Sequence, residues 1–210
     1  MDADPEEDPE TRALLERLDS GEAEAWDQLL GQHREELWHQ VDLRLDRRLR
    51  RRVDPSDVVQ EAQLEATRRL TDYLARRPMP LRLWLRQLAQ ERLIMAHRYH
   101  AGAACRSVGR DVPLLVASST VLGQQVAAQG SSPSQGLRRQ EEVSRVRQAV
   151  AELSEADREM VLMRNFEQLT NQQAAAVLGI DPVTASQRYG RALLRLRSIL
   201  AGLGVTGSQP

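Results

Sequence analysis

The sequence predicts an all-α protein with two small helical domains joined by a flexible linker. Aromatic residues make up only 3% of the chain, while Leu, Ala and Arg are frequent and β-branched residues are sparse, a mixture that favours helices over sheets. Apolar residues recur every three to four positions over long stretches, which is the period of an amphipathic helix. A segment rich in small and polar residues, 101–135, separates two such stretches and is the best candidate for a linker.

The chain is therefore predicted to divide into a tail, a domain, a linker, a second domain and a short tail. The segments are an acidic disordered tail over 1–10, a helical domain over 11–100, the linker over 101–135, a helical domain over 136–204 and a tail over 205–210. The first tail carries like charges and two prolines, which favour a solvated chain. Gly21 and Gly31 are candidate breaks between the first helices, and a short helix over 112–126 is weakly indicated.

Composition limits the compartment and the kind of partner. All 29 basic residues are arginine, a side chain suited to bidentate contacts with phosphate and guanine. The single cysteine, Cys105, excludes an internal disulfide, and no apolar run approaches the roughly 18 residues of a membrane span. The acidic N-terminus lacks the basic and then apolar order of a signal peptide. We therefore expect a cytoplasmic protein without membrane insertion.

The first domain contains a sharp helix start. Asp54 can cap the helix, Pro55 fits its first position, and Asp57 places a carboxylate in the first turn, where the helix dipole favours it. This helix should run to about Leu74. Prolines then interrupt it, and the next helix is expected over 81–99.

The second domain contains the spacing of a helix-turn-helix. Thr170 and Gln173 have the spacing of a capping box, and Gly179 can take the left-handed conformation that ends a helix. Asp181 and Pro182 start the next helix after a turn of three or four residues.

This second helix has a polar and basic face that suits nucleic acid. Polar residues near its start can reach base edges, and cations further along can hold phosphates. The residues concerned are Thr184, Ser186, Gln187 and Arg188 for bases, and Arg191 and Arg195 for phosphates. On spacing alone, an ordinary amphipathic helix with a solvated basic face remains an alternative.

Residues 153–170, 174–180 and 188–197 together resemble region 4 of the extracytoplasmic-function sigma factors, which belong to the sigma-70 type. In that family, the resemblance implies docking on the β-flap of RNA polymerase and recognition of the minus-35 promoter element. The implied contacts are those just named on the second helix.

The helix start in the first domain resembles region 2 of the same family. Asp54, Asp57, Gln60 and Glu61 match its Asp-x-x-Asp-x-x-Gln-Glu pattern, and Val58 lies within it. Asp57, Gln60 and Glu61 fall on one side of a helix, and the resemblance implies that this side binds the β′ coiled coil of core RNA polymerase. The alternative is a well-capped helix with a solvated acidic face.

Aromatic and arginine residues interleave after this helix, which suits the stacking of unpaired bases beside a phosphate-binding surface. By resemblance, the loop over 72–80 receives a flipped minus-10 base. The minus-10 residues implied are Tyr73, Arg76, Arg77, Trp84 and Arg86. A core position is the alternative reading of Trp84.

The sequence predicts a sigma factor and not an enzyme, with no cofactor and no metal. It has no phosphate-cradling Gly-rich loop and no hydrolase motif, and His97, His100 and Cys105 are too few ligands for structural zinc. A sigma-like protein that binds an anti-sigma partner without engaging DNA stays open, as does a helix-turn-helix repressor. The role of the arginine run over 44–52 stays open between binding and solvation.

Overall fold

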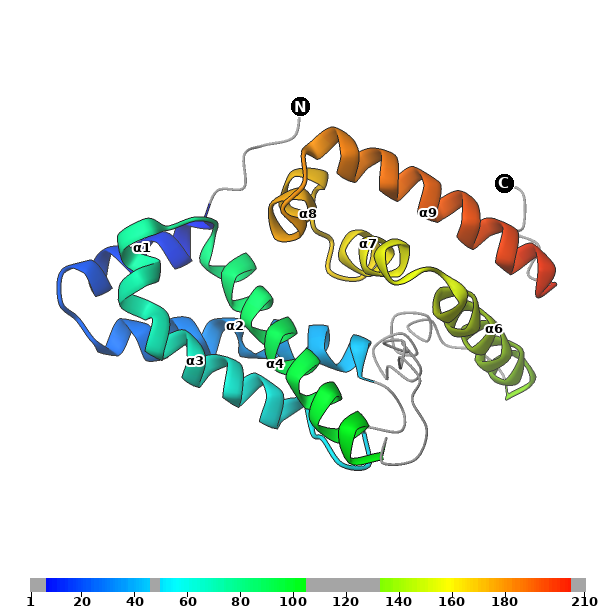
Figure 1. Ribbon diagram of the computed structural model, residues 1–210, viewed down its shortest axis with the longest axis horizontal. Helices are drawn as coiled ribbons and strands as arrows, with labels where there is room; N and C mark the ends of the chain where they lie inside the picture. Colours follow the sequence, from blue (N-terminus) through cyan, green and yellow to red (C-terminus); the bar gives the residue numbers. More distant parts are fainter. Residues whose placement is uncertain (1–6, 46–49, 105–132, 205–210) are drawn as a thin grey trace. The chain divides into compact units, whose positions relative to one another are not determined.

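The computed structural model describes residues 7–45, 50–104 and 133–204, and every regular element in these residues is an α-helix (Figure 1). The predicted all-α class is confirmed for this part of the chain. The chain forms two compact units, one of Met1–Val41 with Leu49–Gly109 and one of Asp42–Arg48 with Arg110–Pro210. The helix predicted over 112–126 lies outside the described residues.

The first unit is built from four helices. They are α1 (Pro9–Asp19), α2 (Glu24–Arg44, up to Val41 in this unit), α3 (Pro55–Arg76) and α4 (Leu81–Ala104). Helix α2 continues through Gly31, so the predicted break there is wrong. Leu29 and Leu37 are buried on either side of it, and this packing outweighs the roughly 1 kcal/mol that a glycine costs inside a helix. Gly21, with φ 94°, does lie between α1 and α2.

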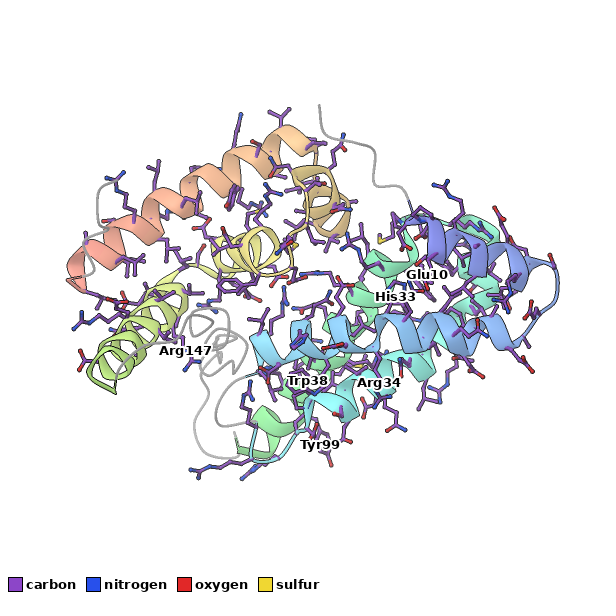
Figure 2. The ribbon with its side chains drawn as sticks, turned by 180° about the vertical axis from the view of Figure 1, so that it is seen from behind. Glu10, His33, Arg34, Trp38, Tyr99 and Arg147 are labelled. Atoms are coloured by element: carbon purple, nitrogen blue, oxygen red, sulfur yellow. The ribbon has the colours of Figure 1, made fainter. Side chains whose placement is uncertain are left out.

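Side chains of α2 reach both α1 and α3. The indole Nε1 of Trp26 donates to Thr67 Oγ1 at 3.0 Å, and the Gln63 amide donates to the carbonyl of Leu30 at 2.9 Å. His33 lies buried against α1, with its Nε2 3.4 Å from Thr11 Oγ1 (Figure 2). Burial lowers the pKa of His33, because an apolar environment disfavours the imidazolium ion.

The second unit contains α6 (Pro133–Glu152), α7 (Glu155–Asn165), α8 (Asn171–Leu178) and α9 (Pro182–Gly202). Helix α9 packs against each of the other three helices. Its buried Ala192 joins Leu153 and Val161 in one apolar cluster. Leu196 packs against this cluster and also against a second one, formed by Val150 and Leu162. These contacts position α9 on the unit and leave its opposite side exposed.

A buried arginine joins α6 to α7. The last carbonyls of a helix have no partner within it. Arg158 of α7 donates to the carbonyls of Val150, Ala151 and Leu153 at 3.1, 2.7 and 2.8 Å. Burial lowers the pKa of Arg158, and these three acceptors compensate for the desolvation of its charge.

Replacing Arg158 by Met should lower the free energy of unfolding by about 2 kcal/mol, because the carbonyls of Val150, Ala151 and Leu153 lose the guanidinium donor, while Val150 keeps a long bond of 3.3 Å from the Leu153 amide. Urea unfolding followed by circular dichroism measures this change. Arg145→Met is the matched control on α6, since Arg145 makes only a surface pair with Glu141 at 3.8 Å and should cost less than about 0.5 kcal/mol. Equal losses for the two variants would contradict the role assigned to Arg158.

Candidate functional site

The predicted helix-turn-helix is present as α8, a short turn and α9. Thr170 and Gln173 form the predicted capping box: the Gln173 amide donates to Thr170 Oγ1 at 3.1 Å, and the Thr170 amide donates to Gln173 Oε1 at 2.9 Å. Gly179 ends α8 in the left-handed conformation, with φ 63°. A residue with a Cβ is strained at this φ, so the glycine sets the turn between the two helices.

Helix α9 starts at Asp181 and Pro182, as predicted. The Thr184 amide donates to Asp181 Oδ1 at 2.8 Å, and the Thr184 hydroxyl donates to the other carboxylate oxygen. A hydroxyl has a single hydrogen to donate. Thr184 therefore helps to close the cap. While the cap is formed, its hydroxyl can accept a hydrogen bond from a base but cannot donate one.

The outer side of α9 carries most of the predicted DNA-contacting residues. Ser186, Gln187 and Arg191 are exposed, and Arg188 is half-buried. Sequence reasoning missed two apolar neighbours on this helix, Val183 and Leu194, which are 65% and 69% exposed. The sequence could have indicated them, because each is an apolar residue at a helical position outside the buried stripe of α9. The exposed side of α9 therefore combines polar and basic residues with apolar ones.

Arg195 has a partner within the unit. Its guanidinium forms an ion pair with Asp157 of α7, whose side chain is almost fully buried. The predicted role of Arg195 as a phosphate contact thus competes with a structural role, because the same charge compensates a buried carboxylate.

Tyr189 holds α9 against α7. Its hydroxyl donates to Asn165 Oδ1 at 3.0 Å, and the Arg164 guanidinium lies 5.2 Å from the centre of its ring, within the range of a cation–π interaction. Arg164 also donates to the carbonyl of Leu169 in the segment before α8. One arginine therefore links α7, the segment leading to α8, and α9.

The predicted polymerase-binding residues lie at the start of α3. Asp54 caps this helix by accepting from the Ser56 amide at 2.7 Å. Asp57, Gln60 and Glu61 are exposed on one side of the helix, whereas Val58 is only 2% exposed and belongs to the core. A direct contact of the Val58 side chain with a partner is thus contradicted in this structure, since the side chain packs inward.

Sequence reasoning also missed Leu64 on α3, a large apolar side chain that is 56% exposed. It lies seven residues after Asp57, or two helical turns along the same side. We call Asp57, Gln60, Glu61 and Leu64 the α3 stripe. A stripe of acidic and polar residues that ends in an exposed leucine is suited to a protein partner with a basic and apolar surface.

The predicted minus-10 residues divide into buried and exposed groups. Tyr73 and Trp84 are 3% and 9% exposed and stack on each other, with ring centres 4.3 Å apart. Arg86 is 3% exposed. The sequence predicted that bases stack on Tyr73 or Trp84. This stacking is not available in this conformation, because each ring is covered by the core. Arg76 and Arg77 are exposed at the end of α3.

The arginine run over 44–52 is not one solvated face. Arg44, within the second unit, is 2% exposed and pairs with Glu159 at 2.8 Å and with Glu167. Burial opposes its charge, but the two carboxylates outweigh burial and raise the pKa of Arg44. Arg51 and Arg52 are exposed. The run therefore contains both structural and solvated arginines.

Comparison with known proteins bears on both units. Residues 144–196 match the family described as "Sigma-70, region 4". The fold resembles that of CnrH in its complex with the cytosolic domain of CnrY, with 20% identity, a TM-score of 0.58, and coverage of 92% of this chain and 98% of CnrH. It also resembles the sigma factor RpoE in complex with the anti-sigma factor NepR from Bartonella quintana, with 18% identity, a TM-score of 0.54, and coverage of 83% and 96%.

The second unit thus carries a match to sigma-70 region 4, and the fold is that of the solved sigma-factor structures. The region 4 match takes in the end of α6, all of α7 and α8, and most of α9, so the helix-turn-helix lies within region 4. For α1 to α4, the likeness to the solved structures concerns the fold. No curated protein matches the sequence significantly. Among the described residues, no helix has the length and apolar character needed to cross a membrane.

The cap of α9 makes the start of this helix sensitive to acid. The hydrogen bonds from Thr184 lower the pKa of Asp181. A lowered folded-state pKa stabilises the folded protein above the ordinary pKa, and this stabilisation is lost as pH falls through the folded-state value. We expect the Thr184 amide resonance to titrate at a lower pH than an ordinary aspartate, measured by NMR.

The variant Thr184→Val removes the hydroxyl donor and keeps the shape of the side chain. It should move the titration midpoint of Asp181 upward, towards the ordinary value. Ser198→Ala, at an exposed position on the same helix, is the control and should not move it. An unchanged midpoint in Thr184→Val would contradict the assignment of the cap.

Proposed function

We propose that this protein is a sigma factor, which binds core RNA polymerase and directs it to promoters. In this proposal α9 reads the minus-35 element, the α3 stripe docks on the β′ coiled coil, and region 4 docks on the β-flap. The observation that carries the proposal is the exposure of Ser186, Gln187 and Arg191, with the half-buried Arg188 beside them, on a helix that is capped at its start and packed against three others. A rigid helix with polar and basic residues near its start suits the major groove.

The loop between α3 and α4 is the proposed site for unpaired minus-10 bases. Arg76 and Arg77 supply exposed charge for phosphates. Tyr73 and Trp84 support the loop from the core, and they do not stack on the base in this conformation. The protein thus supplies specificity, and the polymerase supplies the catalytic chemistry. We expect it to act in the bacterial cytoplasm, where the polymerase is.

Regulation by an anti-sigma protein is the second candidate property. Both solved relatives were captured with a partner, CnrH with the cytosolic domain of CnrY and RpoE with the anti-sigma factor NepR. The exposed Leu64 and Leu194 lie on the two surfaces that we assign to polymerase and promoter. A partner that covered either surface would block initiation.

Transcription with purified core polymerase and a library of promoter sequences tests the proposal. The expected result is initiation that depends on this protein, with enriched sequences at two positions upstream of the start sites. Binding to DNA without polymerase would favour a repressor. A protein that forms no holoenzyme and selects no promoter would contradict the proposal and favour the partner-binding alternative without DNA engagement.

Two sets of variants separate DNA reading from polymerase binding. Arg188→Ala should reduce promoter-dependent transcription about tenfold, the effect of losing one good base or phosphate contact, and leave core binding unchanged. Asp57→Ala with Gln60→Ala should weaken core binding. The matched control is Asp27→Ala with Gln32→Ala, two exposed positions on α2. Normal transcription by Arg188→Ala would show that the recognition helix is wrongly assigned.

A further inference from the structure

Helix α4 lacks a cap of its own. The helices α1, α3, α7, α8 and α9 begin after an Asp, Ser or Thr whose side chain accepts from the first turn. Helix α4 begins after Pro80, whose ring has no acceptor. The Pro80 carbonyl accepts from the amides of Leu83 and Trp84, each at 3.0 Å. The amide of Leu81, which is fully buried, therefore needs an acceptor from elsewhere in the chain.

Glu7 supplies that acceptor from 74 residues away in the sequence. The Leu81 amide donates to Glu7 Oε1. The Tyr73 hydroxyl lies 3.2 Å from the same oxygen. A single carboxylate oxygen thus binds the last part of α3 and the first residue of α4, the two helices that flank the proposed minus-10 loop.

The Tyr73 hydroxyl extends this connection into the loop itself. It also lies 3.1 Å from the carbonyl of Met79, so its one hydrogen is shared between two acceptors. The ring of Tyr73 stacks on Trp84 of α4. Glu7, Tyr73, Met79 and Leu81 therefore form one network, which we call the Glu7 network.

The other side of the loop is held by α1. Arg77 ends α3 in the left-handed conformation, with φ 38°, which is costly for a residue with a side chain. Its guanidinium forms an ion pair with Asp19 at the end of α1. Two carboxylates of the N-terminal segment, Glu7 and Asp19, thus contact the loop from opposite ends.

Charge at Glu7 is not what the network needs. Burial raises the pKa of the Glu7 carboxyl group, although the bonds from Leu81 and Tyr73 and the charge of Arg77 act against this rise. A raised folded-state pKa means that ionisation of Glu7 destabilises the fold as pH rises through that value. A glutamine has the same acceptor oxygen and no such cost. Since both bonds reach the single oxygen Oε1, we expect the geometry to need that acceptor oxygen more than the negative charge.

We propose that Glu7 is a positioning residue for capture of the minus-10 strand, because it holds the start of α4 and the α3–α4 loop in the conformation that receives an unpaired base. The inference rests on the proposed promoter function. It also assigns a role to the boundary of the acidic tail, since the predicted tail over 1–10 contains a half-buried residue whose carboxylate bonds to α3 and α4. Glu7 itself does not touch the DNA.

The test measures binding of reconstituted holoenzyme to the single minus-10 strand of the promoter most enriched in the library experiment. Glu7→Ala should weaken this binding roughly five- to tenfold, since the Leu81 amide loses its acceptor and the Tyr73 hydroxyl keeps the Met79 carbonyl but is no longer tied to the start of α4. Glu7→Gln should stay within about twofold of the unchanged protein because it restores the oxygen. Affinity for core polymerase should be the same for all variants.

Glu10→Ala is the matched control. It removes the same charge from an exposed position in the first turn of α1 (Figure 2), and strand binding should not change. If Glu7→Ala folds poorly, Tyr73→Phe provides a second test, because it keeps the ring stack and removes the hydroxyl. It should weaken strand binding in the same direction, and Glu7→Gln should not deepen that loss.

The outcomes separate the inference from the proposed function. If the unchanged holoenzyme does not bind the minus-10 strand, the proposed function fails. If it binds and Glu7→Ala binds equally well, the positioning role fails. Tighter binding by Glu7→Ala would also overturn the inference, since Glu7 would then be an inhibitor of the loop. Equal losses in Glu7→Ala and Glu7→Gln would show that the charge, and not the oxygen, is required.

Discussion

The amides of the first helical turn have no carbonyl partner within their own helix, and each helix in the described part of the chain is subject to that constraint. Most helices satisfy it locally, with a cap residue such as Asp54 or Asp181. Two further helix ends depend on a side chain from outside the helix. Arg158 of α7 binds the last carbonyls of α6, and Glu7 binds the first amide of α4. At these two ends, a hydrogen bond also fixes how neighbouring segments pack.

The same constraint shapes both surfaces that we assign to the promoter. In region 4, the cap at Asp181 fixes the start of the reading helix and engages the Thr184 hydroxyl, while Tyr189 and its partners hold the flank. In the first unit, the loop between α3 and α4 is held by Glu7 on one side and Asp19 on the other. Bases are thus proposed to meet surfaces that are already ordered, which lowers the entropic cost of binding.

Local signals in the sequence predicted the helix starts at Asp54, Thr170 and Asp181, because a cap and the amides it binds lie within three residues of each other. Long-range partners could not be predicted in this way. Arg195 pairs with a carboxylate 38 residues away, Tyr73 with one 66 residues away and Leu81 with one 74 residues away. The helical period shows which side a residue takes, but not which distant side chain lies there. For this reason a structural arginine and a core tyrosine were expected on the DNA-binding surface.

Residue-resolved hydrogen exchange of the free protein, measured by NMR at the Leu81 amide, tests most directly whether a distant acceptor fixes the start of α4. The account predicts a protected amide in the unchanged protein and in Glu7→Gln. It predicts exchange at least about tenfold faster in Glu7→Ala, because the amide loses the acceptor that Glu7 supplies. Equal protection of Leu81 in Glu7→Ala and in the unchanged protein would contradict it.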